Sequence, residues 1–171
     1  MKSKTSESKS GILSYDKWSI YFDLEDQEIL QRLERLINKE NMSIIDLISI
    51  KPDLYVPLWG SFILIIFIFI FGNIKSLLLN HLFSYDLLPK SASLIFGYLF
   101  LSPIFFYLLG KFNEININIL QILVLIGYSM LFYIPSIILS AIPIFFISLI
   151  IFFFSFISSS YFLIQNLKTY I

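Results

Sequence analysis

The sequence predicts an all-α protein: a polytopic membrane helical bundle with about four spans, preceded by cytosolic amphipathic helices. The chain of 171 residues is 57% hydrophobic and only 14% charged. Its charges are unevenly placed, because residues 1–56 carry eight Lys or Arg and ten Asp or Glu, whereas residues 57–171 carry four Lys and two acids. The second region also contains apolar stretches that reach the roughly 20 residues a spanning helix needs. The chain therefore divides into a soluble N-terminal region, residues 1–56, and a transmembrane domain, residues 57–165.

The N-terminal region is expected to hold a disordered tail and two helices. Residues 1–11 are dominated by Lys, Ser and Glu, which is typical of a solvated tail. In residues 24–38 the apolar side chains recur at helical spacing and form one face: Ile29, Leu30, Leu33, Leu36 and Ile37. Residues 43–50 begin with a capping-box pattern and are too short to span a membrane. The first helix is expected to pack on the rest of the protein, with a membrane-surface or partner-binding role as the alternative.

The transmembrane domain is divided by charges and prolines. The spans are placed at about residues 57–74, 92–110, 118–140 and 143–165, with a short tail at 166–171. Residues 117–164 are almost free of charge and too long for one span, so Pro143 is expected to break them and to occupy the first position of the last helix. Pro103 and Pro135 fall inside spans, where a bundle tolerates them as kinks.

Composition bounds the chemistry that the chain can perform. The sequence has no cysteine, which excludes disulfides and thiolate metal sites. Its net charge of zero provides no excess of positive charge for binding nucleic acid. The expected spans contain no ionisable acid, base or histidine, which argues against a pump, a coupled transporter or an enzyme. The single histidine, His81, has no second ligand nearby in sequence, so neither a metal site nor a cofactor is expected. The Lys/Arg distribution near the spans favours a cytosolic N-terminus.

Small residues predict where the helices pack. Ser155 and Ser159 stand four residues apart on the last span, and Ser136 and Ser140 share a face of the third. Such spacing lets helices approach closely in a membrane. Glycines add three further points of close approach: Gly60, Gly97 and Gly127. Packing within the bundle is the simpler interpretation, and contact with a second membrane protein is the alternative.

The segment "KPDLYVPLWG" at 51–60 predicts a stiff entry into the first span. A residue before proline is biased away from the helical region, so Val56 is expected to be extended and Pro57 to begin the helix. Tyr55 and Trp59 are amphipathic aromatics suited to headgroup depth. Asp53 can accept hydrogen bonds from free N–H groups at the helix start.

These residues also carry a resemblance. "PDLYVP" resembles the Asp-Leu-Tyr-Gly-Pro signature of the Yip-domain family (Ypt-interacting proteins, YIPF in animals), multi-span proteins of the Golgi and early secretory pathway. "IGYSMLFYIPSIILSAIP" at 126–143 resembles the second signature of that family, and "FGNI" at 71–74 resembles the end of its first span. The likeness covers about residues 15–145. Because the family usually has five spans, the chain is either a four-span form or incomplete.

The resemblance implies a role in vesicle-mediated transport rather than catalysis. It implies a Golgi membrane protein, with the endoplasmic reticulum or endosome as alternatives, that binds Rab/Ypt-type small GTPases, other Yip-family proteins, or both. The signature residues carried over are Asp53, Leu54, Tyr55 and Pro57 in the first segment and Gly127 and Tyr128 in the second. Asp53 is expected either to be presented to a partner at the membrane edge or only to cap the helix. Two other functions stay open: a four-span pore or small-solute carrier, and a bilayer-shaping protein.

Overall fold

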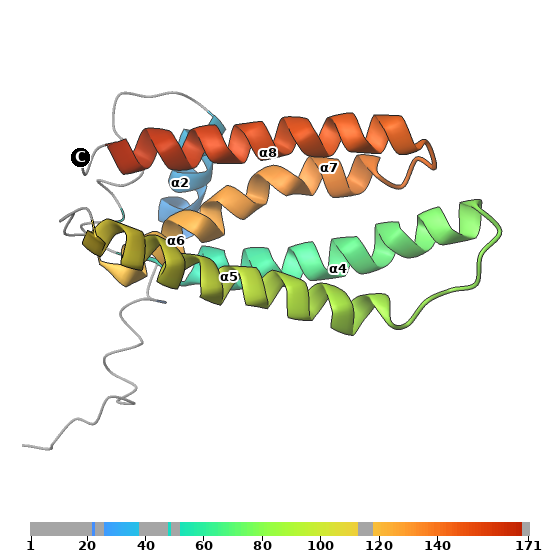
Figure 1. Ribbon diagram of the computed structural model, residues 1–171, viewed down its shortest axis with the longest axis horizontal. Coiled ribbons are helices and arrows are strands. Elements are labelled where there is room, and N and C mark those ends of the chain that lie inside the picture. The colour runs from blue at the N-terminus through green and yellow to red at the C-terminus, as the bar shows by residue number, and fades with distance from the viewer. Residues whose placement is uncertain (1–21, 23–25, 38–47, 49–51, 113–117, 169–171) are drawn as a thin grey trace, which may run out of the picture.

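A computed structural model describes residues 22, 26–37, 48, 52–112 and 118–168. Its elements are α2 (Asp26–Ile37), α4 (Tyr55–Leu78), α5 (Leu87–Phe112), α6 (Ile119–Met130), the 3-10 turn η1 (Leu131–Tyr133), α7 (Ile134–Leu139) and α8 (Phe145–Leu167). Four helical stretches are long and apolar enough to cross a membrane: α4, α5, the run from α6 through α7, and α8 (Figure 1). The prediction of an all-α bundle with four spans is confirmed.

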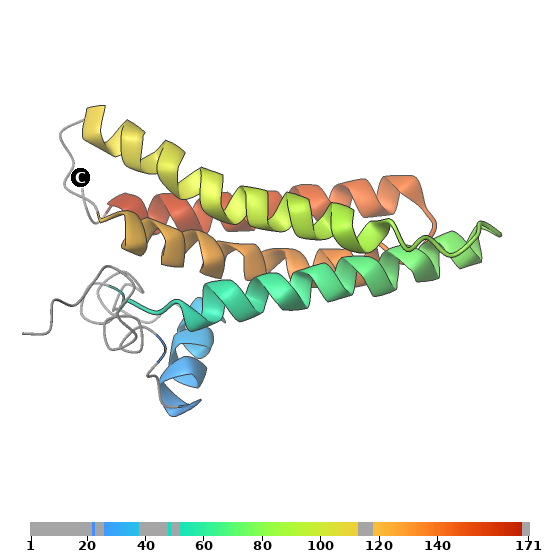
Figure 2. The ribbon, with the colours of Figure 1, turned by 90° about the horizontal axis from the view of Figure 1, so that it is seen from below.

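The third span is the centre of the bundle. Of its most apolar stretch, 56% of the residues are buried, against 17–22% in the other three spans. α6 contacts α4, α5 and α8, and α7 also packs on α4 and α8. Figures 1 and 2 show the α4–α5 pair on one side of this central span and α8 on the other. The other three spans therefore expose most of their apolar side chains to the surrounding lipid.

Local sequence explains how the central span begins and bends. Asn118 caps α6: its side chain accepts the Leu120 N–H at 3.2 Å, and Gln121 reaches back to the Asn118 N–H at 3.4 Å. The irregularity expected at Pro135 is present, because η1 interrupts the helix just before it. Pro103 lies buried inside α5, which continues as one helix.

A tight turn joins the third and fourth spans, and Pro143 lies in this turn rather than in the last helix. Pro143 is in the turn, and α8 begins only at Phe145 after an extended Ile144 (φ −110°, ψ 107°). The prediction that Pro143 opens the helix is therefore wrong. The fixed φ of proline suits a turn as well as a first helical position, so the sequence alone did not distinguish the two.

The turn after α4 is built from its own polar residues. Asn80 has φ 58° and lets the chain close a Schellman motif, in which His81 N–H donates to Ser76 O at 2.8 Å and Asn80 N–H to Leu77 O at 3.0 Å. Asn73, buried within α4, then holds the following loop: its Oδ1 accepts the Ser84 N–H at 2.7 Å and its Nδ2 donates to the Ser84 carbonyl at 3.2 Å. The start of α5 is thereby tied to α4.

We expect Asn73→Ala to loosen this loop without unfolding the bundle. Two hydrogen bonds to Ser84 backbone would be lost, at a cost of about 1 kcal/mol each. Limited proteolysis between residues 79 and 86 should therefore become faster, while the detergent-solubilised protein still elutes as a single folded species. Asn80→Ala is the contrasting variant, because it strains a positive φ and leaves the Asn73–Ser84 bonds in place.

The structure describes only part of the N-terminal region in which two helices were predicted. α2 agrees with the helix expected at 24–38, and Ile29 packs against the core at the neighbouring end of the bundle. Leu30 is 64% exposed, so it is not on the packed face as predicted. The tail at 1–11 lies outside the described residues, and so does the helix at 43–50 apart from Ile48, which is helical and fully buried.

Candidate functional site

A buried polar junction joins three separate parts of the chain at the α2 end of the bundle. At its centre is Asp53, whose side chain is 0% exposed. Its Oδ1 accepts the Tyr55 N–H at 2.7 Å, and its Oδ2 accepts the Tyr128 hydroxyl at 3.0 Å. Arg32 of α2, itself 5% exposed, places Nη1 3.9 Å from the same Oδ2. One carboxylate therefore contacts α2, the start of α4 and the last turn of α6.

The start of α4 differs from the prediction in a way that explains this geometry. The helix begins at Tyr55, so Pro57 is its third residue and Val56 is helical rather than extended. A proline in the first turn costs no intrahelical hydrogen bond, since those N–H groups have no partner in the helix. Val56 is buried in the core cluster, and this burial offsets the disfavoured helical conformation before proline. The predictions of an extended Val56 and of a helix that begins at Pro57 are therefore wrong.

The two signature segments also meet through a backbone contact. An added Cβ on Gly127 would lie 2.4 Å from Pro57 Cβ and 2.6 Å from its Cα and Cγ. No side chain fits at such distances, so α6 and α4 approach each other here only because residue 127 is glycine. The contact sets the register in which Tyr128, the next residue, reaches Asp53.

Burial and hydrogen bonding shift the pKa of the Asp53 carboxyl in opposite directions. Burial raises the pKa of the Asp53 carboxyl above its ordinary value, while the hydrogen bonds from Tyr55 and Tyr128 and the charge of Arg32 oppose that rise. A raised folded-state pKa means that stability falls as the pH rises through it, because the folded protein binds the proton more tightly than the unfolded one. Arg32 and Tyr128 limit that loss.

The structure places the predicted signature residues in two groups. Asp53, Pro57, Gly127 and Tyr128 come together in the junction and are buried. The expectation that Asp53 is presented to a partner is wrong for this conformation, because a side chain in that position cannot be reached from outside. Leu54 is half-buried against the core, whereas Tyr55 is 38% exposed and lies next to Trp59, which is 51% exposed, with the two rings tilted and their centroids 5.9 Å apart.

Arg32 is the residue that sequence reasoning missed. It belongs to the segment predicted to be an amphipathic helix, where its spacing from Glu28 suggests only a local i,i+4 pair. A usable signal existed: a lone acid beside the first span needs a compensating charge if it is buried. Among the residues of α2, the basic ones were therefore candidates to pair with Asp53. Nothing in the sequence said that Asp53 would be buried.

The predicted packing serines and glycines are only partly where expected. The hydroxyls of Ser136 and Ser155 hydrogen-bond across α7 and α8, and Ser159 is buried on the same helix as Ser155. Ser140 donates only to Ile137 O of its own helix, at 2.7 Å. Among the glycines, an added Cβ on Gly60 would meet Leu131 at 3.1 Å, whereas one on Gly97 would meet nothing within 4 Å. Gly97 is therefore not a point of close approach.

Comparison with known proteins gives the junction its context. A protein described as "Protein YIPF1 homolog" from Dictyostelium discoideum is 27% identical in an alignment of 173 positions that covers 95% of this chain. The chain is a distant homologue of this protein and spans 48% of its length. No family model matches the chain, and no solved structure matches it either.

The two segments that resemble the Yip-domain signatures converge in this junction. They lie about 75 positions apart in sequence, and Asp53 with Tyr128, one from each, are hydrogen-bonded to each other. Within the described part of the chain, no three His, Asp or Glu side chains are grouped so that they could hold a metal ion. The junction has the character of a structural tie between elements.

Proposed function

We propose that this chain is a non-enzymatic membrane protein of vesicle-mediated transport, which binds Rab-type small GTPases, other Yip-family proteins, or both. We place it in the Golgi or early secretory pathway, with its N-terminus in the cytosol. The observation that carries the proposal is the junction itself. It joins the two segments that resemble the Yip signatures and fixes α2 at the end of the bundle, and the distant homology supports the same family.

The junction supports recognition indirectly, through what it holds in place. The buried residues Asp53 and Tyr128 position α2, whose outer face carries exposed Leu30, Gln31 and Glu34. Tyr55 and Trp59 extend this exposed surface onto the start of α4. We infer that a cytosolic partner contacts this surface. Because α2 is ordered before binding, less conformational freedom would be lost on association.

A pore through this chain alone is less consistent with the fold. The axis of the described bundle is occupied by the central span, whose residues are the most buried of the four. The homology also points to a family implied here to act in trafficking rather than in conduction. The trafficking proposal is therefore the one we carry forward.

The test is recovery of partners from intact membranes in mild detergent, combined with proximity labelling from residue 1. We expect the wild-type chain to recover prenylated Rab-type GTPases, Yip-family proteins, or both. Asp53→Asn keeps an oxygen that can accept the Tyr55 N–H but removes the charge facing Arg32, so we expect α2 to be held less firmly and partner recovery to fall.

Asp86→Asn is the matched control, because Asp86 also faces a basic residue, Lys90, but is 79% exposed. It should leave recovery unchanged. If the wild-type chain recovers neither class of partner, the proposed function is wrong. If Asp53→Asn recovers partners in full while α2 is measurably less protected from proteolysis, the role given to the docked helix is wrong.

A further inference from the structure

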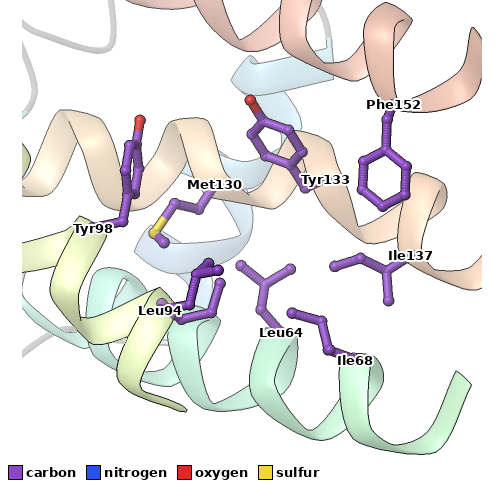
Figure 3. A pocket seen from close by; sticks show the side chains of 9 residues that line it. Leu64, Ile68, Leu94, Tyr98, Met130, Tyr133, Ile137 and Phe152 are labelled. Atoms are coloured by element: carbon purple, nitrogen blue, oxygen red, sulfur yellow. The ribbon is translucent and has the colours of Figure 1, made fainter. Parts of the chain in front are cut away.

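A cavity of about 500 Å³ lies between the spans, away from the junction. Figure 3 shows its walls: Leu64 and Ile68 extend from α4, Phe152 descends from α8, and Tyr98 and Tyr133 stand on the remaining sides. The lining is almost wholly apolar, and its volume falls within the roughly 300–1,000 Å³ of ordinary ligand sites. The side chains come from all four spans, so the cavity depends on the assembled bundle.

The position of the cavity along the spanning helices determines whether it faces lipid headgroups or hydrocarbon chains. Leu94 and Tyr98 line it from α5, four and eight residues beyond Lys90. Lys90 pairs with Asp86 at 3.7 Å, and both are highly exposed, so they mark the polar edge of the span. At 1.5 Å per residue, the cavity begins about 6 Å below that edge and reaches about 12 Å deep. In a leaflet whose hydrocarbon layer is about 15 Å thick, this is the depth of the middle part of a lipid acyl chain.

Size and polarity select among possible occupants. Two turns of a helix about 10 Å across fill roughly 850 Å³, so a partner helix could press only one edge into the cavity. Tyr98 and Tyr133 carry the only hydroxyl groups among the lining residues, so the cavity offers little to a polar ligand. An unbranched hydrocarbon chain satisfies both conditions, because it is thin, flexible and without hydrogen-bonding groups.

We propose that this cavity is a binding site for one acyl chain of a phospholipid, whose headgroup lies beside Asp86 and Lys90. The zwitterionic edge formed by these two residues suits a headgroup that carries both charges, such as phosphocholine. The lipid bridges α4, α5 and α8 through the central span and fills space that side chains leave open. Its role is separate from partner binding at the α2 end.

The test uses phosphatidylcholine with a photoreactive diazirine midway along one acyl chain. The full chain is reconstituted with this lipid and then extracted into mild detergent, so that loosely held lipid is diluted away before irradiation. We expect retained adducts on peptides that contain cavity residues. Leu94→Trp fills the cavity from a position that is already 67% exposed, so the protein should still fold and retained labelling should fall severalfold.

Leu101→Trp is the matched control, because Leu101 lies on the same helix, is 68% exposed and does not line the cavity. It should retain wild-type labelling. Adducts spread evenly over lipid-facing positions, no retained adducts, or an equal loss in Leu101→Trp would each overturn the proposal. A photoreactive sterol that labels the cavity and is not displaced by phosphatidylcholine would overturn the choice of an acyl chain.

Discussion

Gly127→Ala is expected to be the most damaging single-methyl substitution in the bundle. The new Cβ would lie 2.4 Å from Pro57 Cβ, and the neighbour is a rigid ring whose Cα is only 2.6 Å away. Neither side can relax by a rotamer change, so α6 must shift away from α4. Overpacking of this kind usually costs about 1–3 kcal/mol, and we expect the upper end because backbone must move. The same shift would carry Tyr128 away from Asp53.

The measurement is the fraction of protein that remains monodisperse after heating in mild detergent, together with its abundance in membranes. Gly97→Ala is the control, because it adds the same methyl group to a spanning helix where no atom lies within 4 Å. By helix propensity it should be neutral or stabilising by up to about 1 kcal/mol. Equal behaviour of the two variants would contradict the close packing at Gly127.

The second large effect is expected from Arg32→Met. Removing one member of a buried ion pair leaves the other charge uncompensated, which typically costs about 3–5 kcal/mol. Asp53 would keep its bonds from Tyr55 and Tyr128 but lose the nearby positive charge, so we expect a loss near the lower end. Undocking of α2 should precede unfolding of the bundle, because α2 is joined to the spans at this junction. Faster cleavage within α2 under limited proteolysis would report it.

The pH dependence of this variant has a definite sign. Burial already raises the pKa of Asp53, and loss of the opposing Arg32 charge should raise it further. The destabilisation by Arg32→Met should therefore be largest above that pKa and shrink as the pH falls through it, since the carboxyl is then neutral. Lys90→Met is the control: its pair is as short, at 3.7 Å, but exposed, so it should change neither stability nor pH dependence. A defect in Arg32→Met that does not vary with pH would show that lost packing, rather than lost charge, is responsible.

The number and placement of the spans could be predicted because lipid imposes a length and polarity on each segment. The helix at α2 was likewise visible from its periodicity. What hydropathy could not show is which span is central. The third span has a mean hydropathy of 2.2, the same as the first and fourth. A partial signal was the small and polar residues of α6, since Gly127 and Ser129 favour close approach by a neighbouring helix.

The junction could not be predicted as a whole because its members are distant in sequence. Asp53 and Tyr128 are 75 positions apart, and Arg32 lies on a helix outside the membrane domain. Local rules assigned each of them a local role: Asp53 as a helix cap, Tyr128 as a signature residue and Arg32 as the partner of Glu28 on the same helix. Pairing them required the α4–α6 contact at Gly127, which fixes which side chains face one another. The error at Val56 had a related cause, since burial outweighed the local preference of a residue before proline.

The central position of the third span has a consequence for how such a sequence can drift over time. Residues of the outer spans mostly meet fluid hydrocarbon, which accepts any apolar side chain of similar size, whereas residues of α6 meet fixed neighbours on several sides. Mutational tolerance should therefore be unequal among four segments whose compositions look alike. Lineages could exchange Phe, Leu and Ile freely along α8 while α6 stays nearly constant. Retention of the fold as the sequence changes would then depend on α6 far more than on the other three spans.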